Sequence, residues 1–464
     1  MNQESESRPK PGKRGFWKWL LAGTVLLIAV SVLVVLKSDD VLLPYDDLKV
    51  VEAPVPDIHT NGYLYLREKW GQWPRNGPYE RVKAMANGQE PQDQAFIDRL
   101  RNGRANSVED WRTALAMPEW RLPFPVSDGV ETGSWMILPV QLLVFDAMIS
   151  LRAGDAGPAI ALQQEMALWI KRHLAGGDGI TSVLVATAAM EMVADLGCGV
   201  LALGNPDSGQ LGVMARVWGE EPLIAEAWQS AVRKDGAVFR SMMDQVQSGA
   251  GPFGEAQFRS KWREKLLFKK NRTLNAYHES LRKIVAAPFQ PFPSLLAAQQ
   301  AGYGLLPESD HPLLGQWNPN TTGNLFLRGT RGLGLLVLSQ YKALFIPRAM
   351  KVRLAVHGWR RNHPSQRPST LTELAPDFLP EVPKDPWNGA PLLWDHATGT
   401  VYAVGADWNP DPPVFPPEDR GWTATNPKAP GLRMALRLPA SAAPAAPAYP
   451  AANVVADPHP EETE

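Results

Sequence analysis

Residues 139–174 read PVQLLVFDAMISLRAGDAGPAIALQQEMALWIKRHL, and they give the strongest indication of the fold class. Two runs with helical apolar spacing, residues 139–151 and 158–174, are separated by the short sequence RAGDAG. Glycine commonly ends a helix, aspartate can cap the next one, and a proline such as Pro158 suits a first helical turn. The stretch predicts an antiparallel helical hairpin in a mainly α-helical chain, similar to the units of tetratricopeptide-like (TPR-like) solenoids.

The following run, residues 180–195 (ITSVLVATAAMEMVAD), is apolar nearly all round. Glu191 and Asp195 interrupt it, and its uncharged part is shorter than the roughly 20 residues that cross a bilayer. We therefore expect a core helix here, with a second membrane span as the alternative.

Shorter helices are expected at residues 62–70 and 107–116. Further core stripes at helical spacing are Phe239, Met242, Met243 and Val246, and then Phe258, Trp262 and Leu266.

An unbroken uncharged run, WLLAGTVLLIAVSVLVVL, extends from Trp19 to Leu36 near the N-terminus. Basic residues precede it and acidic residues follow it, and this asymmetry predicts a cytoplasmic N-terminus. The sequence thus predicts a single-pass protein of the inner (cytoplasmic) membrane, with its bulk in the periplasm. A cleaved signal peptide is the alternative, but no small-x-small site follows the run. The flanking charges are Arg8, Lys10, Lys13, Arg14 and Lys18 before the run, and Asp39, Asp40, Asp46 and Asp47 after it.

The composition of the 464-residue chain excludes several classes of protein. The formal net charge of −1 disfavours a nucleic-acid partner, and the mean hydropathy of −0.22 disfavours a polytopic membrane protein. The lone cysteine, Cys198, permits neither an internal disulfide nor a cysteine-based zinc site. Because glycines flank it in an apolar stretch, we expect an inert buried thiol.

The chain divides into six segments by composition and pattern. Residues 1–15 are a basic cytoplasmic tail, 16–37 the transmembrane anchor, 38–134 a Pro/Trp-rich entry segment, 135–330 the helical domain, 331–411 a kinked helix with a small β-hairpin module, and 412–464 a Pro/Ala-rich, largely disordered tail. Within the helical domain, residues 259–272 hold seven basic residues against one acid. This cluster indicates a solvated helix face, or a contact with lipid headgroups or an acidic partner.

Residues 349–411 resemble the C-terminal module of the major pseudopilin of type II secretion. The matching pieces are Leu371 with Leu374, the sequence VPKDPW at 382–387, and YAVGAD at 402–407. The resemblance implies a small α+β module whose structural residues are Asp385, Pro386, Trp387, Tyr402 and Gly405. The family's cleavage site would need glutamate where Leu20 stands, so a processed, polymerising pilin is not expected. The whole chain looks like uncharacterised membrane-anchored envelope proteins of planctomycete- or verrucomicrobium-like bacteria.

The residues of this module predict its local structure independently of the resemblance. Pro383 and Pro386 favour an extended path around Asp385, whose carboxylate can accept backbone N–H groups. Residues 391–394 and 400–404 read as two strands, joined by a turn at 395–399. Trp387 and Trp394 are expected to clamp this hairpin onto a helix at about residues 332–361, which Pro347 should kink.

Asp407, Asn409 and Asp411 place three oxygen ligands at alternate positions, which is compatible with calcium. The pseudopilin resemblance implies a calcium site in the corresponding loop. Pro412 stands where an EF-hand needs glycine, so a looser site, or simply a solvated acidic turn, is expected. No zinc-hydrolase or serine-nucleophile motif is present, and Gly329 to Gly334 read as a loop that starts a helix.

Three functions remain open on these grounds. The first is a non-catalytic envelope scaffold or assembly protein with protein partners or a homo-oligomeric state. The second is an accessory component of a type II secretion or pilus-like machine. The third is an extracytoplasmic hydrolase with an unrecognised carboxylate site.

Overall fold

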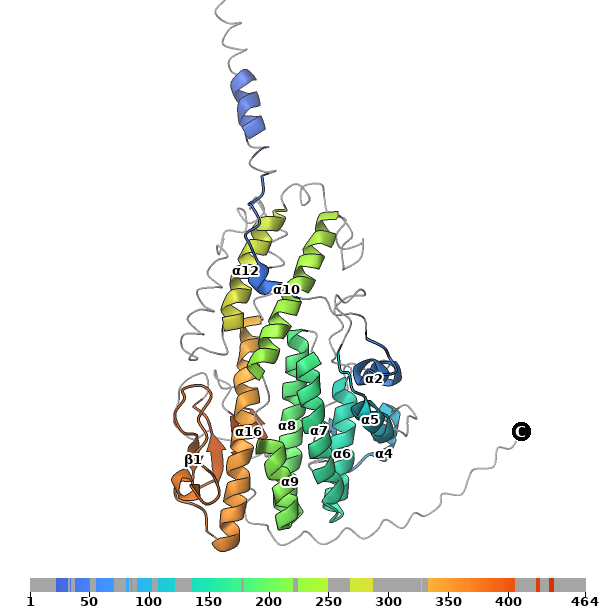
Figure 1. Ribbon diagram of the computed structural model, residues 1–464, viewed down its shortest axis with the longest axis vertical. Coiled ribbons are helices and arrows are strands. Elements are labelled where there is room, and N and C mark those ends of the chain that lie inside the picture. Colours follow the sequence, from blue (N-terminus) through green and yellow to red (C-terminus); the bar gives the residue numbers. More distant parts are fainter. Residues whose placement is uncertain are drawn as a thin grey trace, which may run out of the picture.

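The computed structural model describes residues 22–31, 34, 38–50, 56–70, 81–82, 85, 90–101, 107–121, 136–176, 179–219, 224–248, 268–286, 327, 333–364, 366–404, 423–425 and 434–437. The described part is mainly helical with one small sheet, as the sequence predicts. Figure 1 shows a body of roughly aligned long helices, with the sheet on one side and short N-terminal helices on the other.

The predicted hairpin is formed by α6 (Ile137–Arg152) and α7 (Gly157–Gly176), which pack against each other. Gly154 adopts φ of 93°, a left-handed conformation that glycine reaches without steric cost. Asp155 accepts the N–H of Gly157 at 2.9 Å, so it caps the start of α7. The hairpin prediction is confirmed, whereas the TPR-like comparison stays a prediction.

Helix α8 (Ile180–Leu203) is the centre of the body and packs against α6, α7, α10 and α16. Among the described residues it is the one helix long and apolar enough to cross a membrane, but 78 % of its apolar window is buried inside the protein. This burial favours the core-helix interpretation over a second span. Cys198 lies in α8 with no exposed surface, as expected for an inert thiol.

Three further helices continue the body: α9 (Ser208–Gly219), α10 (Ile224–Ser248) and α12 (Lys270–Ala286). Phe239 and Met243 of α10 are buried as predicted, and the Phe239 ring stacks on Tyr277 of α12 with centroids 3.8 Å apart. The second predicted stripe, Phe258, Trp262 and Leu266, lies outside the described residues. Helices α10 and α12 pack together at the end of the body nearest the N-terminal helix (Figure 1).

Helix α16 (Leu333–Asn362) runs alongside α8 in the same direction and continues through Pro347. Three contacts fix the register. Lys342 pairs with Glu191, Met350 Sδ lies 3.8 Å from Cys198 Sγ, and Arg361 donates to the Pro206 carbonyl that follows α8. The residue numbers increase along both helices from one contact to the next, so the two helices are parallel.

The C-terminal module packs against α16, and its sheet also contacts α8. Helix η5 (Leu371–Leu374) begins at a capping box made by Thr370 and Glu373, and the hairpin of β1 (Leu393–Asp395) and β2 (Thr400–Tyr402) follows. The predicted turn is present: Gly399 has φ of 68° and its N–H reaches the Asp395 carbonyl at 2.8 Å.

The sheet extends beyond the predicted module. Strands β3 (Thr423–Thr425) and β4 (Met434–Arg437) complete an antiparallel sheet in the order β1-β2-β4-β3. Both fall within 412–464, the segment expected to be largely disordered, so we correct the boundary of the module at 411. A lone two-stranded hairpin is marginally stable, and added strands supply backbone partners for its exposed edge.

The entry segment carries α2 (Gly62–Trp70), α4 (Gln94–Arg101) and α5 (Ser107–Ala116), and the 3-10 helix η1 (Asp46–Leu48) precedes them. Helices α2 and α5 coincide with the two predicted short helices. They pack together, and α5 also contacts α6 and α7.

Candidate functional site

The described part of the N-terminal apolar run is a helix, Ala22–Ser31, whose large side chains face outward. Val25, Leu26, Leu27, Ile28 and Val30 each expose between 51 and 69 % of their surface. Figure 1 shows this helix projecting beyond the α10–α12 end of the body. A contiguous apolar surface of this kind is costly in water.

Residues 38–48, here called the strap, connect this apolar helix to the body. Asp39 accepts the N–H groups of Asn271 at 2.7 Å and Arg272 at 3.2 Å, so its carboxylate caps the first turn of α12. Just before that turn, the Lys269 ammonium donates to the carbonyl of Ser38. The strap is thus fixed to the N-terminal end of α12.

One asparagine holds the middle of the strap. The Leu43 N–H donates to Asn275 Oδ1 at 2.9 Å, and Asn275 Nδ2 donates to the Val41 carbonyl, also at 2.9 Å. The side-chain amide therefore pairs with the strap backbone as a neighbouring strand would. Val41 and Leu43 are 83 % and 55 % exposed, so their side chains face away from α12.

Arg282 holds the far end of the strap with three hydrogen bonds. Its Nε lies 2.8 Å from Asp47 Oδ2, and its Nη2 lies 3.0 Å from Asp47 Oδ1 and 2.7 Å from the Pro44 carbonyl. The hydrogen bond from Arg282 lowers the pKa of Asp47, and the charge of Arg282 adds to the effect. Arg233 of α10 donates to the Asp47 carbonyl at 3.1 Å, so both helices grip this end.

An aromatic contact completes the junction between the strap and the helices. The Arg240 guanidinium lies 4.7 Å from the centroid of the Tyr45 ring, and the His278 ring lies 4.9 Å from it. Arg240 Nη1 is 3.3 Å from His278 Nε2, and Nη2 donates to the buried Leu48 at 3.5 Å. Burial, followed by the charge of Arg240, lowers the pKa of His278 to about 4, so the imidazole is neutral and can accept from Arg240.

These contacts advance together along both segments. Strap positions 39, 43, 45 and 47 meet α12 positions 271, 275, 278 and 282. The strap therefore runs parallel to α12 and contacts it along most of its length. The arrangement is a joint between the segment that follows the apolar helix and the packed body.

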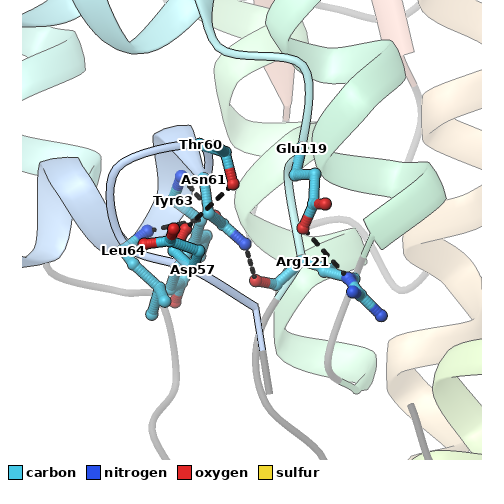
Figure 2. Close-up of polar contacts among 7 residues, drawn as sticks. All are labelled: Asp57, Thr60, Asn61, Tyr63, Leu64, Glu119 and Arg121. Atoms are coloured by element: carbon cyan, nitrogen blue, oxygen red, sulfur yellow. Dashed lines mark hydrogen bonds and ion pairs between the residues drawn. The ribbon is translucent and has the colours of Figure 1, made fainter. Parts of the chain in front are cut away.

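A second set of contacts joins two distant parts of the entry segment (Figure 2). Asn61 Oδ1 accepts the N–H groups of Tyr63 at 3.0 Å and Leu64 at 3.2 Å, which caps α2. Asn61 Nδ2 donates to the Arg121 carbonyl at 2.6 Å, the Gly62 N–H donates to the Glu119 carbonyl at 2.9 Å, and the Glu119 N–H donates to the Thr60 carbonyl at 3.1 Å. One buried side chain thus caps a helix and ties it to a segment 60 residues further on.

Trp120 lies between two glycines that leave room for it. A Cβ at Gly62 would come within 2.5 Å of the Trp120 ring, and a Cβ at Gly176, the last residue of α7, would overlap the Trp120 carbonyl oxygen. Arg172 of α7 donates to the carbonyls of Leu115 and Met117, which satisfies the C-terminal end of α5. The entry segment is therefore locked against the C-terminal end of α7.

A stack of buried rings fills the space between these elements. Neighbouring centroids are 6.0 Å apart for Trp70 and Trp111, 5.5 Å for Trp111 and Trp169, 4.8 Å for Trp169 and His173, and 6.1 Å for His173 and Tyr63. Each ring is at most 2 % exposed. Burial lowers the pKa of His173 to about 4, so this histidine is neutral and serves as a core ring rather than a general acid or base.

Consecutive residues of α10 bind the turn between α7 and α8. Lys234 donates to the Gly176 carbonyl at 3.5 Å, at the negative end of α7, and Asp235 accepts the Ile180 N–H at 3.1 Å, at the positive end of α8. Asp235 also occupies the space beside Gly179, whose φ is 153°. Burial raises the pKa of Asp235 to about 7.

The module residue Asp385 makes the contacts that its surroundings predict. It is 1 % exposed and accepts the N–H groups of Trp387 and Val404, each at 2.8 Å. The first bond is local, and the second joins the Asp-Pro-Trp turn to the residues that follow β2. Burial raises the pKa of Asp385, although these backbone hydrogen bonds oppose the shift.

Only one of the two tryptophans clamps the module as predicted. Trp387 is 1 % exposed and stacks on Tyr341 of α16 at 5.7 Å, with an edge contact to Phe345 at 6.3 Å. Trp394 instead donates its indole N–H to the Pro368 carbonyl at 2.8 Å, inside the module. Tyr402 is buried and pairs with Leu393, and Pro386 is half-buried in the turn.

The predicted calcium ligands Asp407, Asn409 and Asp411, like the module residue Gly405, lie outside the described residues. Among the residues that the structure does describe, no group of three or more His, Cys, Asp or Glu side chains could hold a metal ion. The sequence reasoning missed the strap. Its acidic residues were used only to orient the membrane helix, and the basic residues that bind them lie more than 180 positions away.

Comparison with models of protein families, with curated proteins and with solved structures found no match.

Proposed function

We propose that this protein is a non-catalytic scaffold or assembly protein of the cell envelope, anchored in the inner membrane by a single helix. The anchor corresponds to residues 19–36, the N-terminus faces the cytoplasm and the body lies in the periplasm. The strap is the observation that carries the proposal. An exposed apolar helix leads directly into a segment bound along α12, and such a joint serves to hold a folded body at a fixed place on a membrane.

The rest of the body supports a holding function. The entry segment is tied to α7 through Arg172, and the module is tied to α16 through Trp387. These contacts fix the entry segment and the module onto one helical core. A rigid body of this kind can present surfaces to protein partners in the envelope or to further copies of itself.

Membrane fractionation tests the anchor. The double variant Leu26→Arg/Ile28→Arg places two charges in the apolar helix, where each costs about 2.5–3.5 kcal/mol at the centre of a bilayer. We expect the wild-type protein to resist alkaline carbonate extraction and the variant to be released. The matched control is Leu168→Arg/Leu203→Arg, which charges two exposed leucines of the body (42 % and 52 % exposed) and should stay in the membrane. A wild-type protein released by carbonate would contradict the proposal.

Thiol labelling tests the orientation. Cys198 has no exposed surface and should stay unlabelled in the native protein, so an added cysteine gives a clean signal. Ala397→Cys lies in the exposed turn of the module. A membrane-impermeant maleimide should label this variant in cells whose outer membrane alone is opened. Labelling only after the inner membrane is opened would place the body in the cytoplasm.

A second candidate function, an accessory role in a type II secretion or pilus-like machine, is favoured by the Asp385–Trp387 turn and its hairpin. Crosslinking of the full-length protein in native membranes, followed by mass spectrometry, separates the two. Secretion or pilus subunits crosslinked through residues 366–404 would support the accessory role. Recovery of the protein alone, or of unrelated envelope proteins, would leave the scaffold.

A further inference from the structure

Arg353 of α16 is a fully buried arginine in the centre of the helical body. Its side chain has no exposed surface, and it ranks among the largest completely buried residues. No residue that the structure describes accepts a hydrogen bond from its Nε, Nη1 or Nη2 atoms. A guanidinium offers five N–H donors and no acceptor, so this group has the capacity to hold a negatively charged partner.

The guanidinium must carry its charge in this position. Burial lowers the pKa of Arg353, but arginine remains protonated in proteins. An ionised group that is buried without a counter-charge costs several kcal/mol, and native structures pair such groups. The protein therefore needs an anion beside Arg353.

The side chains that the structure describes around Arg353 do not supply this anion. Cys198 of α8 is the group whose charge would act on Arg353, but burial raises the pKa of its thiol to about 11, so the thiol is neutral. The thiol lies 3.8 Å from the Met350 thioether, which is also uncharged. Asp195, one turn earlier on α8, is partly exposed and has an interaction of its own.

The last turns of α16 add positive charge to this region. His357 follows Arg353 by one turn, and burial and then the charges of Arg361, Arg360 and Arg353 lower its pKa to about 4. Arg361 extends to the Pro206 carbonyl at the end of α8. The potential between the C-terminal parts of α8 and α16 is therefore positive, which attracts an anion.

We propose that Arg353 holds a monatomic inorganic anion, a halide such as chloride, between α8 and α16. The burial of Arg353 argues for this class of ligand. The guanidinium has no surface open to solvent and its helix packs directly on α8, so a phosphate or an organic acid would have to separate the two helices. A halide needs little more room than a buried water molecule and can accept several N–H groups at once.

Thermal unfolding in chloride or gluconate at constant ionic strength tests the proposal, because gluconate is too large for the site. We expect the melting temperature of the full-length protein in detergent to rise by a few degrees, and to saturate, as chloride replaces gluconate. The variant Arg353→Met should fold, since apolar replacement of a buried charge is often neutral or stabilising, and should lose the chloride response. Arg360→Met, one charge fewer on the same helix, should keep it.

Three results would overturn the proposal: no chloride response in the wild-type protein, an undiminished response in Arg353→Met, or loss of the response in both variants. The last would assign the effect to the general charge of α16. Should Arg353→Met fail to fold, crystals of the wild-type protein grown in bromide decide the question by anomalous scattering. A bromide within hydrogen-bonding distance of the Arg353 guanidinium supports the site, and its absence there overturns it.

Discussion

Arg282 grips Asp47 with two parallel hydrogen bonds, of 2.8 and 3.0 Å, across 235 residues of sequence. The fork of a guanidinium matches the two oxygens of a carboxylate, and this match fixes direction as well as distance. Because Asp47 ends the strap and Arg282 lies in the last part of α12, this pair sets where the strap leaves the helix. The pair is partly exposed, so its contribution is to geometry more than to stability.

Breaking this pair should loosen the strap with little change in the stability of the whole protein. In a double-mutant cycle of Asp47→Asn and Arg282→Met, we expect a coupling energy of about 0.5 kcal/mol, as for exposed ion pairs. Hydrogen exchange at the Leu43 and Leu48 amides should quicken, because the contacts beside Asp47 hold both. Glu279→Gln, which removes the exposed Glu279–Lys283 pair of α12, should leave this exchange unchanged. Equal exchange in all variants would mean that the strap does not depend on Arg282.

The Asp47–Arg282 pair should make the stability of the strap depend on pH. The pKa of Asp47 is lower in the folded protein than its ordinary value of 3.8. The stabilisation is therefore complete above pH 3.8 and is lost as the pH falls through the folded pKa. Hydrogen exchange of the strap amides should accelerate in the wild-type protein as the pH falls through this range, and it should change less in Asp47→Asn.

Asp235 should make the protein less stable as the pH rises, the opposite of the effect of Asp47. Its pKa rises from 3.8 to about 7 on folding, so the native state binds the proton more tightly between these values. The free energy of unfolding should fall as the pH rises through this window, by up to about 4 kcal/mol for a shift of this size. Asp235→Asn keeps an acceptor for the Ile180 N–H and has no proton to lose. Its unfolding curves between pH 4 and 8 should show a smaller slope, and an unchanged slope would contradict the assignment.

Gly176→Ala should displace the Trp120 segment. The new Cβ would overlap the Trp120 carbonyl oxygen, which is backbone and cannot rotate away. We expect a loss of about 1–3 kcal/mol in unfolding free energy, and faster proteolysis of the entry segment. The matched control is Gly212→Ala on α9, where the added Cβ meets nothing within 4 Å. That variant should be stabilised by about 0.5–1 kcal/mol, since alanine favours a helix.

Asp385→Ala should release the C-terminal module. Two buried backbone N–H groups, of Trp387 and Val404, would lose their acceptor, and leaving buried donors unpaired costs about 1–3 kcal/mol each. Trp387 should become accessible to fluorescence quenchers, and residues 366–404 should become sensitive to protease. Asp395→Ala, which removes the acceptor for the Ala397 N–H at 3.0 Å in the exposed turn, should cost less than about 1 kcal/mol. Equal effects of the two variants would mean that burial of Asp385 does not matter.

The parts of the fold that local sequence could predict are those whose signals lie close together in the chain. Gly154, Asp155 and Pro158 mark the end of one helix and the start of the next within five positions, and the α6–α7 hairpin follows from them. The Asp385 turn and the Gly399 hairpin are predicted for the same reason. Each depends on backbone conformation and on hydrogen bonds within a few residues.

The joints between distant elements could not be predicted in this way. The strap depends on Asp39 and Asp47 meeting residues of α12, and nothing near either aspartate indicates that partner. Strands β3 and β4 are three and four residues long in a proline-rich segment, so the pairing of β4 with β2, and of β3 with β4, supplies the stability that their own sequence lacks. The burial of Arg353 could not be predicted from the sequence either, because an arginine in a helix usually lies at the surface.

The parallel pairing of α8 and α16 has a consequence for folding of this protein during its synthesis. Glu191 and Lys342 lie 151 positions apart, so at about 5–20 residues per second the ribosome needs roughly 8–30 s to supply the second helix after the first. During that interval α6, α7 and α10 are already available to cover part of α8, but the apolar surface that packs against α16 has no partner. We expect a nascent chain stopped before residue 333 to bind chaperones and to aggregate. A chain extended past residue 362 should do neither.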